Sequence, residues 1–357
     1  MASAESMADG FAPAAHVNDL AAALRSEGHT VSVVGEDSGA YHDAGILGRL
    51  WRYLKINWRM LKALGQYEVF IARAHFAQLP WVLCAWIRGR PVFHEMNGKM
   101  FDAATTYGWL RVLQGIIDRS YLLQFRLASG ITCTTQEIAD HLAERKITTP
   151  LAVVGNGVDP TQFFPGSQQK IVPAAVFPSA LAPWHGVRTL LEALDEAAWP
   201  PDLRVLIVGD GAQADLVRQK ALKDPRVCFL GRADRSELAT ILREASIGLC
   251  LVEPLDARGM REVYPLKLFE MMASGLPIIA TDLPGQRDIV RAHGVGMVIP
   301  CNNPIALAEA VAQFHYSDEL RHMGRRGIVA AKGFYTWRLR AQELIDFIIS
   351  TLQSKQN

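Results

Sequence analysis

This chain of 357 residues has no excess of charge of either sign and no long apolar run. Its 37 basic and 36 acidic residues leave a net charge of +1, so the overall charge does not favour nucleic acid as a partner. The longest apolar runs, such as PWVLCAWI at 80–87, are far shorter than the roughly 20 residues that a membrane-spanning helix needs. No basic segment followed by an apolar core opens the chain, so we expect no signal peptide and a cytoplasmic protein.

Cysteine is also scarce. The five cysteines are scattered and odd in number, and their spacing matches neither a disulfide framework nor a zinc site. We therefore expect small core residues in a reducing compartment.

Continuous apolar strands alternate with helical segments in both halves of the chain, which predicts parallel sheets covered by helices on both faces. The first series contains TVSVVG (30–35), EVFIARA (68–74), RPVFHEMN (90–97), GITCTT (130–135) and LAVVGNG (151–157). The second contains VPAAVFPSA (172–180), LRVLIVGDG (203–211), RVCFLG (226–231), IGLCLV (247–252) and LPIIATD (276–282). We predict an N-terminal domain over 1–160 with a closing helix at 335–357, and a C-terminal domain over 161–334.

The N-terminus departs from this pattern. A doubly wound domain normally begins with a central strand, but MASAESMADGF at 1–11 is dominated by small and polar residues. We expect the first strand to be missing or degenerate.

The stretch VYPLKLFEMMASGLPIIATD at 263–282 predicts a short helix beginning near Pro265, followed by a buried strand. The helix N-terminus exposes unpaired amides that attract anions, and Arg261 and Lys267 would strengthen that attraction. Glu262 precedes the helix, and Glu270 lies about one turn inside it, where it could accept hydrogen bonds from a ribose. A nucleotide-sugar would satisfy the whole set; the alternative is a helix with ordinary surface charges.

Glu262 and Glu270 match the E-x7-E pattern of the family 4 retaining glycosyltransferases, and the stretch around them resembles that family's signature helix and strand. The likeness covers most of the chain. Other segments resemble the family in the right order: GFAPAAHVNDLAAALRSEGHTVSVV (10–34), VVGNGVDPTQFFP (153–165), WHGVRTLLEAL (184–194), LRVLIVGDG (203–211), VCFLGRAD (227–234) and GFYTW (333–337).

The resemblance implies the GT-B fold, with two Rossmann-like domains facing a central cleft. The C-terminal domain would hold a nucleoside diphosphate sugar, and the N-terminal domain would hold the acceptor. Transfer would retain the anomeric configuration and need neither cofactor nor metal. Glu262 would lie near the donor sugar. The residues expected to bind the donor are Glu270, Val263, Tyr264, Pro265, Leu266, Lys267, Arg261, His185, Arg188, Gly209, Gly211 and Arg232.

The chain departs from the family at two positions. Members often place an arginine and a lysine on the loop after the first strand of the second domain, where this chain has Ser179 and His185. A neutral imidazole donates one hydrogen bond where lysine brings a full charge. Stabilisation of the leaving group would then rest on Arg188, Arg261 or Lys267, or be weaker.

In FHEMNG at 93–98, the residues His94, Glu95 and Asn97 end a predicted strand, where sites form in α/β folds. Together with Glu262, His94 and Glu95 are candidate catalytic residues, and strand alternation should turn only one of the latter two toward the site. His94 is equally well explained as a buried structural histidine. The candidates for contacting acceptor or phosphate are Gly10, His16, Arg73 and Asn97; for Arg73, loop capping is the alternative.

Two further patterns suggest other functions. GDGAQA at 209–214 matches a dinucleotide-binding fingerprint, but this would require it to follow the first strand of its domain. In LGRLWRYLKINWRMLKAL at 47–64, helical spacing places Leu and Trp on one face and Arg and Lys on the other. Such a helix can lie on an anionic membrane; the alternative is a helix that packs its apolar face on the sheet.

Three functions therefore follow, of which we favour the first. The first is a glycosyltransferase that uses a nucleotide-sugar and a glycan, lipid-linked or small-molecule acceptor, with peripheral membrane contact through 47–64. The second is a weak or inactive GT-B module that binds nucleotide or a partner glycosyltransferase. The third is an NAD-dependent oxidoreductase. The sequence does not specify the sugar, the base or the acceptor.

Overall fold

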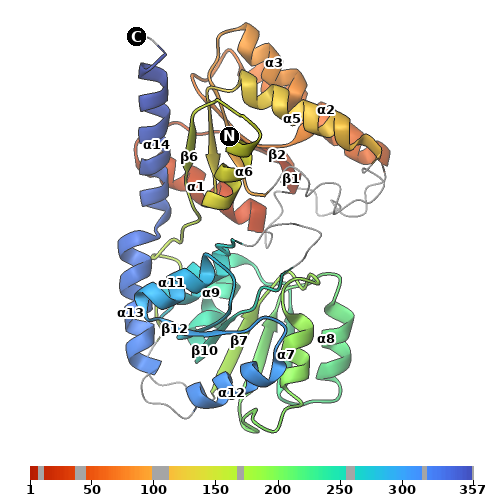
Figure 1. Cartoon of the computed structure of the whole chain (residues 1–357), viewed down its shortest axis with the longest axis vertical. Coiled ribbons are helices and arrows are strands. Elements are labelled where there is room, and N and C mark those ends of the chain that lie inside the picture. The colour runs from red at the N-terminus through yellow and green to blue at the C-terminus, as the bar shows by residue number, and fades with distance from the viewer. Residues whose placement is uncertain are drawn as a thin grey trace. The chain divides into compact units, whose positions relative to one another are not determined.

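The computed structural model describes residues 1–6, 12–36, 46–98, 112–166, 173–254, 262–315 and 320–355. The chain divides into two compact units (Figure 1). The N-terminal unit contains the described residues up to Asn156 and those from Trp337 onward. The C-terminal unit contains the described residues between Gly157 and Thr336.

The N-terminal unit is built on a parallel sheet of six strands in the order β2-β1-β3-β4-β5-β6. Its strands are β1 (Ala2–Ser6), β2 (Val34–Glu36), β3 (Phe70–Arg73), β4 (Val92–Met96), β5 (Gly130–Cys133) and β6 (Leu151–Val153). Its helices are α1 (Ala12–Ser26), α2 (Ile46–Ala63), η2 (Phe76–Gln78), α3 (Leu79–Ile87), α5 (Gln114–Leu127), α6 (Gln136–Glu144) and α14 (Trp337–Gln353).

Strand β4 shows which helices cover which face of this sheet. Phe93 lies 5.8 Å from Phe347 of α14, and Glu95 binds His16 of α1. His94, between them, lies 5.6 Å from Phe125 of α5. Because successive side chains of a strand point to opposite faces, α1 and α14 cover one face and α5 covers the other, where α2 and α3 also bury their apolar residues.

Strand β1 decides between the two expectations for the N-terminus, a missing and a degenerate first strand, in favour of the second. It lies between β2 and β3, where Ala2 pairs with both Val34 and Ala72. Ala2 and Ser3 are buried. Small side chains fit here because Ile56 and Met60 of α2 fill the space above the strand. The strand is degenerate in composition and present in structure.

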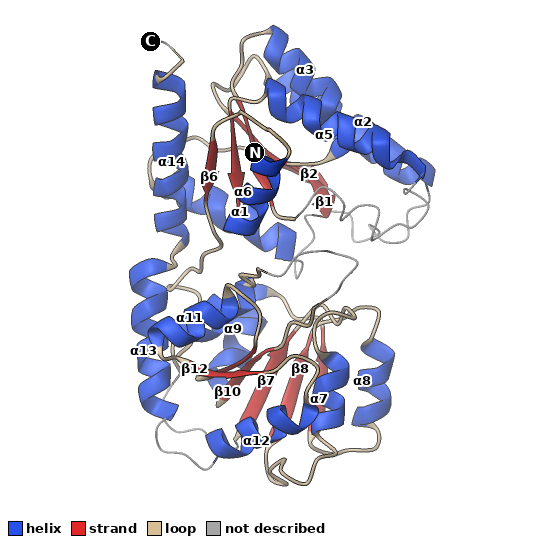
Figure 2. Cartoon of the chain, viewed as in Figure 1, coloured by secondary structure: helices blue, strands red, loops and turns tan. Residues whose placement is uncertain are grey.

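The C-terminal unit has a second parallel sheet of six strands, in the order β12-β11-β10-β7-β8-β9. Helices cover both of its faces (Figure 2). The strands are β7 (Ala174–Pro178), β8 (Arg204–Val208), β9 (Val227–Gly231), β10 (Ile247–Cys250), β11 (Ile278–Thr281) and β12 (Gly296–Ile299). The helices are α7 (Val187–Ala193), α8 (Ala214–Ala221), α9 (Arg235–Glu244), α10 (Leu266–Ala273), α11 (Gln286–His293), α12 (Pro304–His315) and α13 (Leu320–Phe334).

The order of this sheet reverses between β7 and β10, which makes the loops after these two strands the topological switch point where α/β folds bind ligands. The predicted class of two doubly wound, Rossmann-like sheets is confirmed. The stretch at 263–282 forms helix α10 and strand β11, with Leu268, Met271 and Met272 fully buried.

Helix α2 does not pack as the alternative for 47–64 expects. Trp51 and Trp58 are 68% and 60% exposed, whereas Ile56 and Met60 are buried. The helix therefore has two apolar sides. The side with Ile56 and Met60 faces the sheet, and the side with Trp51 and Trp58 faces outward. Among the described helices, none is long and apolar enough to cross a bilayer.

Candidate active site

The loops at the switch point of the C-terminal sheet are joined by one buried carboxylate, Glu253. Its Oε1 accepts a hydrogen bond from the Thr189 hydroxyl (2.9 Å), and its Oε2 accepts one from the Asn302 amide (2.7 Å). Its own amide donates to the carbonyl of Trp184 (2.8 Å). Burial raises the pKa of Glu253, and these hydrogen bonds oppose the rise. Glu253 therefore holds together the loops that follow β7, β10 and β12.

Helix α10 begins at the carboxyl end of β10, and its first turn is the predicted anion site. The Val263 amide donates to the carbonyl of Pro284 (2.9 Å), and Pro265 has no amide hydrogen. Of the residues expected to bind the donor, Val263 and Pro265 therefore offer no free amide at this turn. Leu266 and Lys267 occupy the first turn, where amides have no acceptor within the helix.

Lys267 brings a buried positive charge to this turn. Its Nζ is buried and lies 5.0 Å from the ring centroid of Phe177 at the end of β7. Among the described residues, it has no hydrogen-bond partner. Burial lowers the pKa of Lys267, while Cys250 and Glu270 act in the opposite direction. A buried ammonium without a hydrogen-bond partner is energetically unfavourable. An anion that binds beside Lys267 would relieve this cost and would be attracted strongly by the charge.

Glu270 is buried one turn farther along α10. Its Oε1 accepts a hydrogen bond from Nη1 of Arg235, the first residue of α9, at 2.7 Å. The guanidinium of Arg235 also lies 4.9 Å from the ring centroid of Phe163. The charged hydrogen bond from Arg235 therefore fixes the direction of the Glu270 carboxylate.

Glu262 lies just before this helix and is half-buried. Its Oε1 accepts a hydrogen bond from the hydroxyl of Tyr264 at 3.0 Å. Burial and then the Glu262 carboxylate raise the pKa of Tyr264, so the phenol stays protonated and donates. The two acids of the pair are therefore held differently, Glu262 by a neutral donor and Glu270 by a charged one.

The glycines of GDGAQA are explained by backbone packing. Gly209 and Gly211 have φ of +130° and +151°. A Cβ on them would lie 1.7 Å from the Ser179 carbonyl oxygen and 2.1 Å from that of Ala180. The motif follows β8, the second strand of its unit, so the condition for a dinucleotide fingerprint is not met. Arg232, after β9, lies near Asp210, with Nε 3.4 Å from Oδ2.

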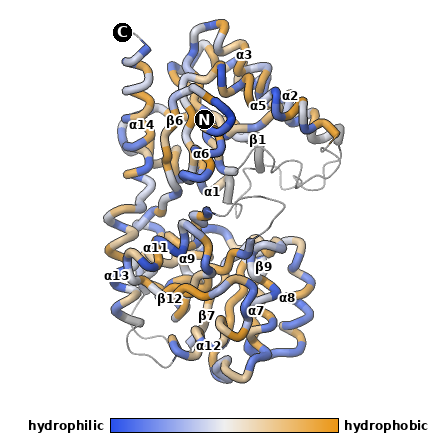
Figure 3. Tube along the Cα trace, viewed as in Figure 1, coloured by the Kyte–Doolittle hydropathy of each residue, from blue (hydrophilic) through white to orange (hydrophobic). Residues whose placement is uncertain are grey.

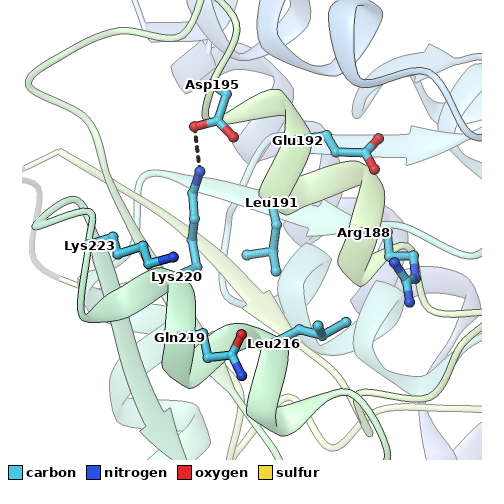
Figure 4. A pocket seen from close by; sticks show the side chains of 8 residues that line it. All are labelled: Arg188, Leu191, Glu192, Asp195, Leu216, Gln219, Lys220 and Lys223. Carbon is cyan, nitrogen blue, oxygen red and sulfur yellow. Dashed lines mark hydrogen bonds and ion pairs between the residues drawn. The ribbon is translucent and has the colours of Figure 1, made fainter.

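Two predicted phosphate ligands lie in different surroundings. His185 is in the loop after β7, with its ring 5.8 Å from that of Trp184. Arg188 is exposed on α7 and lines a surface cavity of about 250 Å³ between α7 and α8 (Figure 4). In that cavity Lys220 pairs with Asp195 at 2.5 Å.

In the N-terminal unit, Glu95 is the centre of a buried polar cluster at the carboxyl end of β4. Its Oε2 lies 2.9 Å from Nε2 of His16, and its Oε1 accepts a hydrogen bond from Asn97 (2.6 Å) and lies 3.6 Å from Arg73 Nη1. Burial alone would raise the pKa of Glu95, but His16, Arg73 and Asn97 lower it to about 2. Three predicted acceptor residues thus meet around this carboxylate.

His16 extends the cluster to two more segments. Its Nδ1 lies 2.9 Å from Oδ1 of Asn156, and its ring meets that of Trp337 edge-on at 4.9 Å. Both ring nitrogens are therefore used within the N-terminal unit, so His16 acts by positioning Glu95.

His94 lies on the opposite face of β4 and is fully buried beside Phe125. Burial lowers the pKa of His94 to about 4, so the ring is neutral. This location argues against a catalytic role and favours the structural alternative. Gly10 and Arg261, two further predicted site residues, lie outside the described residues.

Two protein-family models match this sequence, one mainly in the N-terminal unit and the other mainly in the C-terminal unit. The family model "Glycosyltransferase Family 4" matches residues 14–162, and "Glycosyl transferases group 1" matches residues 172–316. The chain belongs to glycosyltransferase family 4. The family predicted from the E-x7-E pattern is thereby confirmed.

Curated relatives of this family 4 chain include mannosyltransferases. A phosphatidyl-myo-inositol mannosyltransferase of Mycobacterium leprae is 30% identical over 46% of this chain and 42% of that protein. A GDP-mannose-dependent alpha-mannosyltransferase of Mycolicibacterium smegmatis is 29% identical over 71% of this chain and 62% of that protein. The chain thus spans less than two thirds of these two relatives. A third, the phosphatidyl-myo-inositol mannosyltransferase of Mycobacterium tuberculosis, is 25% identical over 92% of this chain and 90% of that protein.

Solved structures show the same fold. Sucrose-phosphate synthase from Thermosynechococcus elongatus has a TM-score of 0.74 at 16% identity, covering 99% of both chains. Anabaena HepE in complex with UDP-glucose also has a TM-score of 0.74, at 17% identity, covering 98% of this chain and 99% of that one. The predicted GT-B fold of this family 4 chain is confirmed.

Several residues at the two sheet edges were not predicted from the sequence. They are Arg235, Glu253, Asn156 and Trp337. Arg235 follows Asp234, whose side chain caps α9, so a helix start beside a family 4 base-binding loop is the signal that could have drawn attention to it. Glu253 lies in the loop shortly after the buried strand β10 (Ile247–Cys250), which is also a recognisable position.

Proposed function

We propose that this family 4 chain is a retaining glycosyltransferase that moves a sugar from a nucleoside diphosphate sugar to a glycan or lipid-linked acceptor. The observation that carries the proposal is the first turn of α10, where the buried ammonium of Lys267 lies beside open helix amides and the Glu262–Glu270 pair. A fixed positive charge at the first turn of a helix, at the switch point of an α/β sheet, favours a phosphate or pyrophosphate ligand.

In this proposal the donor is held by three kinds of group. The amides of Leu266 and Lys267 bind the distal phosphate, and Glu270 accepts hydrogen bonds from the ribose through the oxygen that Arg235 does not use. Glu262, which Tyr264 orients, contacts the donor sugar. The loops around Gly211 and Arg232 receive the base.

The chemical step depends on stabilising the departing diphosphate. His185 replaces the lysine that family members often have, so we assign the full positive charge to Lys267. That charge sits in a buried place where electrostatic stabilisation is strong, and no metal ion is needed for it. The acceptor hydroxyl attacks on the face from which the diphosphate leaves, so the configuration is retained.

The acceptor is assigned to the N-terminal unit, at the carboxyl ends of β3 and β4. Glu95 holds Arg73 and Asn97 there, and both can contact sugar hydroxyls or a phosphate. We propose a lipid-linked acceptor, because curated relatives are named for phosphatidyl-myo-inositol. Peripheral membrane contact through α2 would bring the chain to such an acceptor.

The first donor to test is GDP-mannose, for which a curated relative is named. The experiment measures release of nucleoside diphosphate from GDP-mannose, UDP-glucose and other nucleotide-sugars, together with melting shifts by GDP, UDP and ADP. Glu270→Ala should abolish turnover with the active donor, whereas Glu309→Ala, an exposed acid on α12, should not change it.

The outcomes separate the alternatives. A melting shift without turnover of any donor would indicate an inactive nucleotide-binding module. The absence of both shift and turnover would contradict the proposal. The presence of β1 removes one reason for expecting an inactive module, and the charge of Lys267 offsets the departures at Ser179 and His185.

A further inference from the structure

Helix α2 of the N-terminal unit presents apolar side chains to solvent along most of its length. Leu50 and Leu54 are 54% and 55% exposed, and Trp51 and Trp58 are more exposed still. The opposite side of the helix, with Met60, is buried in the core. The exposed side is therefore not needed for folding of this unit.

The neighbouring helix α3 repeats the arrangement. Trp81 and Val82 are fully buried, whereas Trp86 and Ile87, one turn on, are 55% and 68% exposed. Arg88 follows at the helix end and is exposed. The outer side of α3 thus combines a tryptophan, an aliphatic residue and a base.

Helix α5 carries the same mixture in a regular spacing. Val112, in the turn before the helix, and Ile116 and Leu123 within it are exposed. Arg119 and Arg126 are exposed between and after them. The intervals of four, three, four and three residues place all five side chains on one helical face.

The three exposed sides form one surface. Helix α3 packs against both α2 and α5 (Figure 1). All three helices cover the same face of the sheet, so their outer sides adjoin, and apolar residues recur along them (Figure 3). We call the outer sides of α2, α3 and α5 the outer helix surface.

The charge on this surface has one sign. Among the described side chains of α2, α3 and α5 and their ends, every charged side chain that is exposed is basic: Arg59, Lys62, Arg88, Arg119 and Arg126. Lys62 places its Nζ 5.0 Å from the ring centroid of Trp58. Asp118, the acid of α5, is half-buried and binds Gln114.

We propose that the outer helix surface docks onto a membrane that contains anionic phospholipid. A bilayer offers negative headgroups directly above an apolar layer, and tryptophan prefers the boundary between them. The outer helix surface matches both layers, because aromatic and aliphatic side chains project beside arginine and lysine. The inference extends beyond α2 to α3 and α5, and it does not depend on which sugar the chain transfers.

The test is co-sedimentation of the full chain with vesicles of phosphatidylcholine alone or mixed with phosphatidylglycerol. We expect binding to the mixed vesicles, weakened by salt, and little binding to phosphatidylcholine alone. Trp51→Ser combined with Trp58→Ser should lower the affinity about tenfold. The matched control, Ile305→Ser combined with Val329→Ser, changes exposed apolar residues of the C-terminal unit and should have no effect.

Charge is tested separately. Arg119→Glu combined with Arg126→Glu should lower affinity for the mixed vesicles at least about tenfold. Lys332→Glu, an exposed base of α13, should not lower it. Equal binding to both kinds of vesicle, or equal losses in the control variants, would overturn the proposal.

Two further measurements keep the result decisive. If the surface variants unfold, quenching of the native tryptophan fluorescence by brominated lipid replaces them, and an absence of quenching overturns the proposal. Sedimentation velocity without lipid tests for a second copy of the chain. A dimer that Trp51→Ser and Trp58→Ser dissociate, without vesicle binding, would assign the surface to self-association instead. Donor hydrolysis is measured independently, so failure of docking and failure of the proposed transfer are distinguishable.

Discussion

In both sheets a buried charge lies at the carboxyl ends of the strands, but Glu95 in the N-terminal sheet is paired and Lys267 beside the C-terminal sheet lacks a hydrogen-bond partner among the described residues. At the edge of the N-terminal sheet, Glu95 meets His16, Arg73 and Asn97, so its charge is balanced within the protein. At the edge of the C-terminal sheet, the ammonium of Lys267 is buried with no hydrogen-bond partner among the described residues. A balanced cluster supports the fold, whereas an unbalanced charge lowers stability unless something binds it. The difference indicates which edge is prepared for an anion.

The largest effect should come from removing the unbalanced charge. Lys267→Met keeps the length of the side chain and deletes its ammonium, so we expect release of nucleoside diphosphate to fall about a thousandfold. The same variant should melt at a higher temperature, because an uncompensated buried charge is gone. Lys332→Met serves as the control in both assays. Unchanged turnover would show that the charge does not act on the donor.

The balanced cluster should respond in the opposite way. His16→Ala removes the hydrogen-bonded imidazole from the buried Glu95 carboxylate, so the free energy of unfolding should fall by about 4 kcal/mol. Urea denaturation measures the change, and His29→Ala, at an exposed position, should be nearly neutral. A loss of less than about 1 kcal/mol would mean that Arg73 and Asn97 suffice for the carboxylate.

The pH dependence of unfolding sharpens the same comparison. The pKa of Glu95 falls from 4.5 to about 2 on folding, so the ionised carboxylate stabilises the protein above pH 4.5. This contribution, about 3 kcal/mol, should be lost as the pH falls from 4.5 through about 2. Melting curves of the native chain and of Glu95→Gln should therefore converge in acid. Parallel curves would contradict the low pKa.

The smallest effect concerns Glu253, the paired carboxylate of the C-terminal edge. Thr189→Val removes one hydrogen bond to the Glu253 side chain while keeping the shape, which should cost about 1 kcal/mol of unfolding free energy. Thr240→Val, at an exposed position on α9, is the control. A rise in donor KM with little change in kcat would indicate that Glu253 positions the loop after β7 for binding.

The sequence was sufficient to predict the two sheets, because fully buried parallel strands read as continuous apolar runs between helices. It also located α10 and the acids around it, because Pro265 and the E-x7-E spacing are local signals. Strand β1 could not be found in this way, since a residue as small as Ala2 fits a central strand only because Ile56 and Met60 of α2 fill the space above it. No local pattern contains that information.

Contacts between distant segments were equally out of reach. Arg235 joins Glu270 from 35 residues away, and His16 joins Glu95 from 79 residues away. Alternation correctly indicated that His94 and Glu95 point to opposite faces, but only the packing shows that His94 lies beside Phe125 of α5 and Glu95 beside His16 of α1. For α2, two sides of the helix could have served as the core side, and helical periodicity alone does not choose between them.

The close approach of Gly209 and Gly211 to the carbonyls of Ser179 and Ala180 has a consequence for how nucleotide preference could diverge among relatives. The backbones of the loops after β7 and β8 are in such close contact that a methyl group would not fit between them. One loop therefore cannot move without the other. A new base would have to be accommodated by exchanging the side chains that project from this joined platform, such as Asp210 and Arg232. If the base binds here as proposed above, its preference should therefore change by replacement of such side chains while the glycines stay.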